Sequence, residues 1–371
     1  MSDGIHRKFL ETLGWTGQEL EEFLPDWLNT ARFLHLTDED VRRAVEEWIP
    51  AYWNISLSGV RKSIAACIRE AADTAKMGAY MREGKKVLYS TMPSCPVCIT
   101  ANKLAGEGRL EISYPYFIVT SVLGAFFNKS TDQLFNGSCM DPNCHHCGMN
   151  CMRADSVMSG TIPKPTVTWN WGLQCNESPK TDEMIFTLGK AEWDNVLTTI
   201  PHDAPLGDSE ADDDERVEYL KEEIRVSQEE VTQHTGIEVR EEHLRAAVSE
   251  YMSYLKRIEH LTDLVMNADP QPLTGNELAL MGICMESAFN TGLGWLNDAI
   301  DTAIAEVEEL IREGRGVLPK GAPRLACHFN PLNIPWIEKT FRDNGVNLTL
   351  GRMFPPASFL IRRIDENDIY T

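Results

Sequence analysis

The sequence predicts an α/β fold with two parallel-sheet lobes, a helical cap at the N-terminus and long helices that bridge the lobes. Three observations carry this prediction. A chain of 371 residues is long enough for roughly two or three domains. From residue 84 onwards, short runs of β-type residues alternate with segments of helical periodicity. Residues 323–350 have the order strand, helix, strand, which is typical of a parallel βαβ unit.

The first two units of the chain are a helical N-terminal region, residues 1–83, and an α/β lobe, residues 84–200. Thr37 precedes three acidic residues and is expected to cap a helix, and residues 58–80 carry apolar side chains at helical spacing. In the lobe, strands are predicted in three short runs, at 86–90, within 114–123 and at 166–171.

The second half of the chain is expected to contain an acidic linker with helices, residues 201–266, and a C-terminal α/β lobe, residues 267–371. Residues 203–230 hold twelve acidic and three basic residues, so they carry −9 of the net charge of −21. We interpret this run as a solvated surface rather than an acidic docking element. A long amphipathic segment then extends to about Gly314 and is expected to break near Gly292 or Gly294.

Composition excludes several classes of function. The net charge of −21 argues against nucleic acid as a partner. The longest apolar run, residues 115–127, is shorter than the roughly 20 residues that span a bilayer, so no membrane association is expected. The first residues lack the apolar core of a signal peptide, which predicts a cytoplasmic protein. No glycine-rich phosphate loop is present, so no directly bound nucleotide is expected.

Cysteine is the residue type that points to chemistry. Because a cytoplasmic chain lies in a reducing compartment, its thiols are expected to bind metal or to react rather than to form structural disulfides. Seven of the ten cysteines fall between residues 95 and 175, and the full set is Cys67, Cys95, Cys98, Cys139, Cys144, Cys147, Cys151, Cys175, Cys284 and Cys327.

Four of these cysteines lie within thirteen residues, with the spacing C-x4-C-x2-C-x3-C from Cys139 to Cys151. Thiolates this close together favour an iron–sulfur cluster over structural zinc, because a second separated CxxC pair for zinc is missing. Unligated thiols are the third alternative. His145 and His146 lie inside this run and are interpreted as polar loop residues.

The remaining cysteines receive simpler interpretations. Cys95 and Cys98 form a CxxC pair after a strand, but no surrounding βαβ unit of the redox-protein type is predicted, so a packed or supporting role is favoured over redox activity. Cys67 and Cys284 lie in amphipathic helices and are expected to be small core residues.

Several segments together resemble the 2-hydroxyacyl-CoA dehydratase and benzoyl-CoA reductase superfamily over residues 84–371. The similar segments are Cys151-Met-Arg-Ala-Asp, Gly160-Thr-Ile-Pro-Lys-Pro, Gly172-Leu-Gln-Cys175, Ala268-Asp-Pro-Gln-Pro-Leu-Thr-Gly-Asn-Glu, Pro323-Arg-Leu-Ala-Cys327 and Asp343-Asn-Gly-Val. Three features depart from the family pattern. Ser-Cys-Pro-Val-Cys follows Met92-Pro93 where the family has a glutamate, Thr166 stands where an aspartate is common, and Cys139, Cys144 and Cys147 are additional.

The resemblance implies two flavodoxin- or Rossmann-like lobes and a [4Fe–4S] cluster held by Cys151, Cys175 and Cys327. It implies an iron–sulfur subunit that acts on acyl-CoA thioesters, by 2-hydroxyacyl-CoA dehydration or by benzoyl-CoA-type ring reduction. It also implies a paralogous subunit or second copy as dimer partner, and a separate iron–sulfur activator ATPase. His328, next to Cys327, is the candidate catalytic imidazole.

Two alternatives remain open. Adding Cys139, Cys144 and Cys147 to the three family positions gives six thiols, the number expected for the double-cubane [8Fe–9S] members that reduce small molecules. The other alternative, from a different class, is a zinc-stabilised scaffold or interaction protein in which residues 139–151 are structural.

Overall fold

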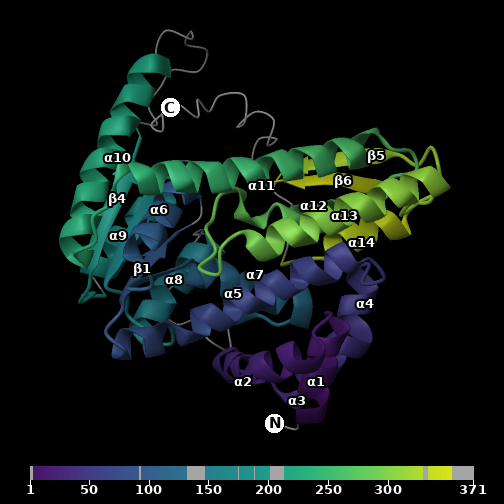
Figure 1. The fold of residues 1–371 in the computed structure, drawn as a ribbon, viewed down its shortest axis with the longest axis horizontal. Coiled ribbons are helices and arrows are strands. Elements are labelled where there is room, and N and C mark those ends of the chain that lie inside the picture. The colour runs from purple at the N-terminus through teal and green to yellow at the C-terminus, as the bar shows by residue number, and fades with distance from the viewer. Residues whose placement is uncertain are drawn as a thin grey trace.

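The computed structural model of the chain describes residues 3–91, 93–131, 147–173, 175–187, 189–200, 213–328 and 333–352. It confirms the predicted α/β fold, with one parallel sheet of four strands and one parallel sheet of two strands among these residues. The two sheets lie toward opposite ends of the molecule, and long helices run between them (Figure 1).

The larger sheet consists of β1 (Lys86–Ser90), β2 (Leu110–Ser113), β3 (Val167–Gly172) and β4 (Asp194–Thr199), in the order β2-β1-β3-β4. All three strand pairs are parallel. The chain moves outward from β1 to β2 and then returns to the other side of β1 for β3, so the topological switch point lies between β1 and β3. In open parallel sheets, the crevice at the carboxyl ends of the strands beside such a point is the usual ligand position.

Helices cover both faces of this sheet, so side chains on both faces of its central strands are buried. The side chains of β2 and β3 are buried throughout, a pattern typical of parallel strands between helical layers. The helices nearest to these strands in sequence are α6 (Pro96–Gly106), α7 (Pro115–Phe127), α8 (Gly148–Ser159), α9 (Glu177–Thr187) and α10 (Asp213–Thr235). Helix α10 packs on β3 and β4, so it belongs with this lobe in space.

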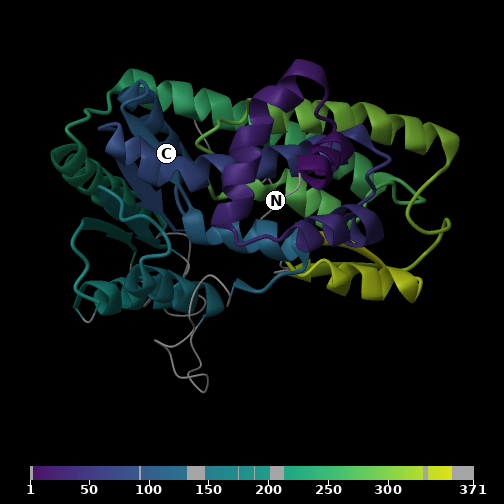
Figure 2. The ribbon, with the colours of Figure 1, turned by 90° about the horizontal axis from the view of Figure 1, so that it is seen from below.

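The N-terminal region is the helical cap that the sequence predicts. It contains α1 (Asp3–Thr12), α2 (Gly17–Phe33), α3 (Asp38–Arg43), η1 (Ala44–Trp48) and α4 (Ile49–Tyr52). Thr37 caps α3 as expected, through a reciprocal pair of hydrogen bonds with Asp40. The rings of Phe9, Trp27 and Phe127 stack where the cap meets α7. Figure 1 shows the cap beneath α5, and Figure 2 shows it in front of the long helices.

Three long helices join the two ends of the molecule: α5 (Ser58–Arg82), α11 (Glu241–Asn267) and α13 (Gly294–Glu313). Helix α11 packs against both α6 and α13, and α13 packs along α5. At Gly59 in α5 an added Cβ would lie 2.7 Å from the backbone nitrogen of Ala303, so glycine permits this close helix crossing. The break before α13 confirms the predicted interruption near Gly294.

The smaller sheet pairs β5 (Arg324–His328) in parallel with β6 (Asn347–Arg352), and α14 (Trp336–Asp343) connects them. This arrangement confirms the predicted βαβ unit. Helix α12 (Gly275–Met281) packs on β6, and Thr274 caps it through a hydrogen bond from the Glu277 amide. The short 3-10 helix η4 (Ile283–Met285) follows α12.

Two local predictions are wrong. The strand expected within residues 114–123 is the helix α7, which begins with Pro115 at a position that favours proline and is apolar on almost every side. The second concerns the CxxC pair, where no βαβ unit of the redox-protein type was expected, whereas β1, α6 and β2 form a parallel βαβ unit around it. The unit boundaries near residues 83, 200 and 266 remain predictions.

In the part of the chain that the structure describes, none of the helices combines the length and the apolar character that crossing a bilayer requires.

Candidate functional site

Two cysteine-bearing segments follow the two central strands of the larger sheet, on either side of its topological switch point. Cys95 follows β1 and directly precedes α6, and Cys175 follows β3 and lies two residues before α9. Because all four strands are parallel, both segments leave the sheet at its carboxyl edge. This edge is therefore the candidate functional site.

The beginnings of α8 and α9 are fastened together beside this edge. The backbone amide of Cys147 donates a hydrogen bond of 2.8 Å to the Glu177 carboxylate, and the amide of Cys151 donates one of 2.9 Å to the Cys147 carbonyl. Cys147 is exposed, whereas Cys151 and Cys175 are half-buried. The structure thus brings the segments of these three predicted site residues together, through contacts of Glu177.

A buried ion pair holds α8 against α9 one turn further along. Arg153 Nη1 lies 2.9 Å from Asp182 Oδ1, and both side chains are only 4% exposed. Asn170 of β3 donates a hydrogen bond of 2.8 Å to the same carboxylate oxygen, and Arg153 Nη2 donates one to the Ser178 carbonyl. Burial raises the pKa of Asp182 to about 6 in spite of the neighbouring Arg153.

One face of α7 connects this region to the smaller sheet. Thr120 donates a hydrogen bond of 3.4 Å to the sulfur of Met152, the residue after Cys151. One turn along the same face, an added Cβ at Gly124 would lie 2.3 Å from the backbone oxygen of Asn333. Asn333 belongs to the connection that follows β5, so the segment after Cys327 and the first turn of α8 both contact α7.

The predicted residues of the smaller sheet occupy the carboxyl end of β5. Cys327 is half-buried and pairs with Gly351 of β6, and His328 is the last residue of the strand. The side chain of His328, and the whole of Cys139 and Cys144, lie outside the described residues. Among the side chains that are described, no group of three or more histidine, cysteine, aspartate or glutamate residues is placed to hold a metal ion.

The donor chemistry of the three predicted ligands nevertheless fits an iron–sulfur cluster, because thiolates are the ligands that such clusters take. Cys151, Cys175 and Cys327 are all half-buried at the ends of elements, where small movements of a loop reorient a side chain. This intermediate exposure suits ligands of a cofactor, because a bound cofactor would cover the part of each residue that is now exposed. Their assembly into one ligand set remains a prediction.

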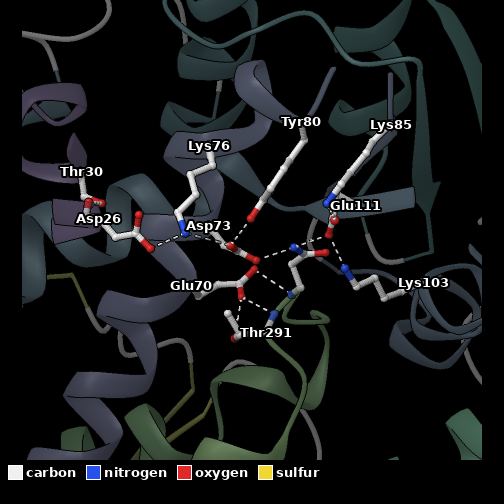
Figure 3. Close-up of polar contacts among 11 residues, drawn as sticks. Asp26, Thr30, Glu70, Asp73, Lys76, Tyr80, Lys85, Lys103, Glu111 and Thr291 are labelled. Atoms are coloured by element: carbon white, nitrogen blue, oxygen red, sulfur yellow. Dashed lines mark hydrogen bonds and ion pairs between the residues drawn. The ribbon is translucent and has the colours of Figure 1, made fainter. Parts of the chain in front are cut away.

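A second polar cluster lies at the opposite, amino edge of the same sheet (Figure 3). Glu111, near the start of β2, is paired with Lys85 at 2.7 Å and with Lys103, and it accepts a hydrogen bond of 2.8 Å from Asn290. Burial alone would raise the pKa of Glu111, but Lys103, Lys85 and Asn290 together lower it. We call Glu111 and these three partners the amino-edge cluster.

Two carboxylates of α5 are linked to the amino-edge cluster through Asn290. Glu70 accepts hydrogen bonds from the amides of Asn290 and Thr291 and from the Thr291 hydroxyl, and Asp73 accepts them from Tyr80 and Asn290. Burial, with the nearby Asp73, raises the pKa of Glu70 to about 8. Because the cluster fastens α5 and the 290–291 loop to the edge strand, we interpret it as structural.

Sequence reasoning identified the cysteines but missed the residues that position them. Glu177, Arg153, Asp182 and Asn170 form no motif, because they come from three different elements and meet only in the folded chain. The one indication was the run Cys151-Met-Arg-Ala-Asp, which has charged residues within one helical turn after the cysteine.

Residues 174–355 match the family model for the D-component of 2-hydroxyglutaryl-CoA dehydratase. The matched region begins one residue before Cys175 and includes Cys327 and His328, but it leaves out the CxxC pair and Cys151. No curated protein matches the chain.

Proposed function

Because residues 174–355 match the family model for the 2-hydroxyglutaryl-CoA dehydratase D-component, we propose that this chain is the iron–sulfur subunit of an enzyme acting on acyl-CoA thioesters. The match indicates a subunit of a dehydratase-type enzyme. We propose dehydration of a 2-hydroxyacyl-CoA as its reaction in preference to ring reduction of a benzoyl-CoA-type substrate, since the matching family is a dehydratase.

The observation that carries this proposal is the position of two predicted ligands inside the matched region. Cys175 follows β3 and Cys327 is the penultimate residue of β5, so each lies near the carboxyl end of a parallel strand. Cys151, the third predicted ligand, lies one helical turn after Cys147. The amide of Cys147 donates a hydrogen bond to Glu177, which is two residues from Cys175. We propose that these three thiolates hold a [4Fe–4S] cluster.

A cluster held by these three thiolates would supply a low-potential electron and Lewis-acid chemistry toward a substrate oxygen. The chain's own part is to hold the thiolates and to fix α8 against α9, which the buried Arg153–Asp182 pair does. We propose His328 as the imidazole nearest to the cluster. We further propose a partner subunit, either paralogous or a second copy, and a separate activator ATPase.

The first test is the iron and sulfide content of protein purified without oxygen. We expect a brown protein with about four iron atoms for each chain. About eight would favour the double-cubane alternative, in which Cys139, Cys144 and Cys147 are also ligands. A colourless, zinc-containing protein would contradict the proposal and favour the scaffold alternative.

Single variants assign the ligands. Cys175→Ser and Cys327→Ser should each lose most of the iron, because serine is a poor ligand for a cluster. Cys67→Ala is the matched control, since Cys67 is 2% exposed in the core and should keep the iron. Iron retention in Cys175→Ser and Cys327→Ser would remove these residues from the ligand set. Turnover that is unchanged in His328→Ala would exclude that histidine as a catalytic residue.

A further inference from the structure

The CxxC pair is built differently from the other described cysteines. Cys95 is the N-cap residue of α6, with Pro96 at the first helical position, and Cys98 lies in the first turn. The two sulfur atoms are 3.2 Å apart, and Cys98 Sγ donates a hydrogen bond to Cys95 Sγ. A disulfide needs a separation of about 2.0 Å, so side-chain rotation of the two residues is enough to close the bond.

The two thiols differ in access. Cys95 is half-buried, whereas Cys98 is 5% exposed. The pKa of Cys95 is lowered, chiefly by the hydrogen bond from the Cys98 thiol and then by the amides of Cys98 and Val97 at the start of α6. The pKa of Cys98 is raised by that same hydrogen bond and by burial. The less buried of the two cysteines is therefore also the better nucleophile.

The two core cysteines provide the contrast. Burial raises the pKa of both Cys67 and Cys284, and neither has the helix-terminal position of Cys95. These two residues show what a purely structural thiol looks like in this chain. Cys95 differs from them in access, in the direction of its pKa shift and in having a second sulfur at 3.2 Å.

The scaffold around the pair is fixed on both sides. The Asn102 side chain donates a hydrogen bond of 2.9 Å to the Cys98 carbonyl and exchanges hydrogen bonds with Gln228 of α10. Before the pair, the Ser94 hydroxyl lies 2.6 Å from the Tyr114 hydroxyl and donates to the Glu286 carbonyl. These contacts hold the start of α6 in position while the thiols themselves rotate.

From this geometry we propose that Cys95 and Cys98 are a redox-active dithiol that undergoes exchange with low-molecular-weight disulfides. The Cys95 thiolate attacks one sulfur of the external disulfide, forms a mixed disulfide and releases the other half as a thiolate. Cys98 then loses its proton, attacks Cys95 Sγ and releases the second half. The external disulfide is thereby reduced to two thiols, and the two protein thiols are oxidised to one intramolecular disulfide.

The test uses the full chain equilibrated without oxygen in buffers of reduced and oxidised glutathione, followed by alkylation and peptide mass spectrometry. We expect Cys95 and Cys98 to be lost together as one intramolecular disulfide, while Cys67 and Cys284 in the same sample stay thiols. Cys98→Ser should accumulate glutathione on Cys95, whereas Cys95→Ser should carry about tenfold less on the buried Cys98. Thermal unfolding of both variants checks that they are folded.

Two results would overturn the proposal. One is a pair that stays reduced in an excess of oxidised glutathione. The other is glutathione accumulating on Cys98 in Cys95→Ser as readily as on Cys95 in Cys98→Ser. Because the measurement is made on the peptide that contains residues 95 and 98, it does not depend on a cluster or on turnover. Failure here therefore leaves the proposed function untouched, and the reverse also holds.

Discussion

Two glutamates at opposite edges of the four-stranded sheet, Glu111 buried and Glu286 half-buried, have opposite surroundings. At the amino edge, Glu111 has two lysines and an asparagine around it, and its pKa is lowered. At the carboxyl edge, Glu286 lies beside the CxxC segment, where its carbonyl accepts hydrogen bonds from Ser94. Burial raises the pKa of Glu286 to about 9, and none of the described residues donates a hydrogen bond to its Oε2.

The difference separates the part of the sheet that stabilises the fold from the part where we propose that the chemistry takes place. A buried carboxylate with several donors contributes to stability, whereas one without donors costs free energy whenever it is charged. The amino edge is satisfied in this sense. The carboxyl edge combines an unsatisfied acid with the thiols that we propose to be functional, as expected where function is retained at the expense of stability.

The largest effect should come from breaking the buried ion pair between α8 and α9. Asp182→Ala leaves Arg153 charged and without its carboxylate, at a position where both side chains are 4% exposed. We expect a loss of about 3–5 kcal/mol in the free energy of unfolding, measured by denaturant titration. Glu192→Ala is the matched control, because Glu192 pairs with Lys164 on the surface and should give no measurable change. Equal effects of the two variants would contradict the role of the buried pair.

A smaller loss is expected at the amino edge. Glu111→Ala removes the common partner of Lys85 and Lys103, but both lysines are about a quarter exposed and can regain water. We expect a loss of roughly 2–3 kcal/mol at pH 7. Since the pKa of Glu111 is lowered, this stabilisation is present above the unfolded pKa of 4.5 and should fade as the pH falls below it. A loss that stays constant from pH 7 to pH 3 would show that packing, not charge, is responsible.

Comparison with the sequence shows which of these features were predictable. The βαβ unit of the smaller sheet, the cap at Thr37 and the strand β1 follow from local patterns of apolar and capping residues. The helix α7 was mistaken for a strand because a short, almost uniformly apolar run carries no clear period. Strand β4 was missed because most of its residues are polar. Its buried positions are set by packing against neighbouring elements, not by an apolar pattern in the sequence.

The candidate site was predictable as a list of residues but not as an arrangement. Cysteine spacing is a local property, so the thiols could be identified from the sequence. The partners of Glu111 come from residues 85, 103 and 290, and the separation along the chain leaves no pattern that links them. For a similar reason the sequence favoured a packed role for the CxxC pair over redox activity. The βαβ unit around the pair depends on strand β2, which was not predicted.

The only effect of opposite sign, and one that grows with pH, is expected for Glu286→Gln. The folded protein keeps the Glu286 carboxyl protonated up to a pKa of about 9, whereas the unfolded chain loses the proton near 4.5. Native protein therefore binds more protons between these values, and this group makes stability fall as the pH rises, by at most about 1.4 kcal/mol per pH unit. The variant should match the wild type near pH 5 and become more stable than it toward pH 9. Parallel stability curves for the two proteins would show that Glu286 is already satisfied in the folded chain, and the contrast between the two edges would then be lost.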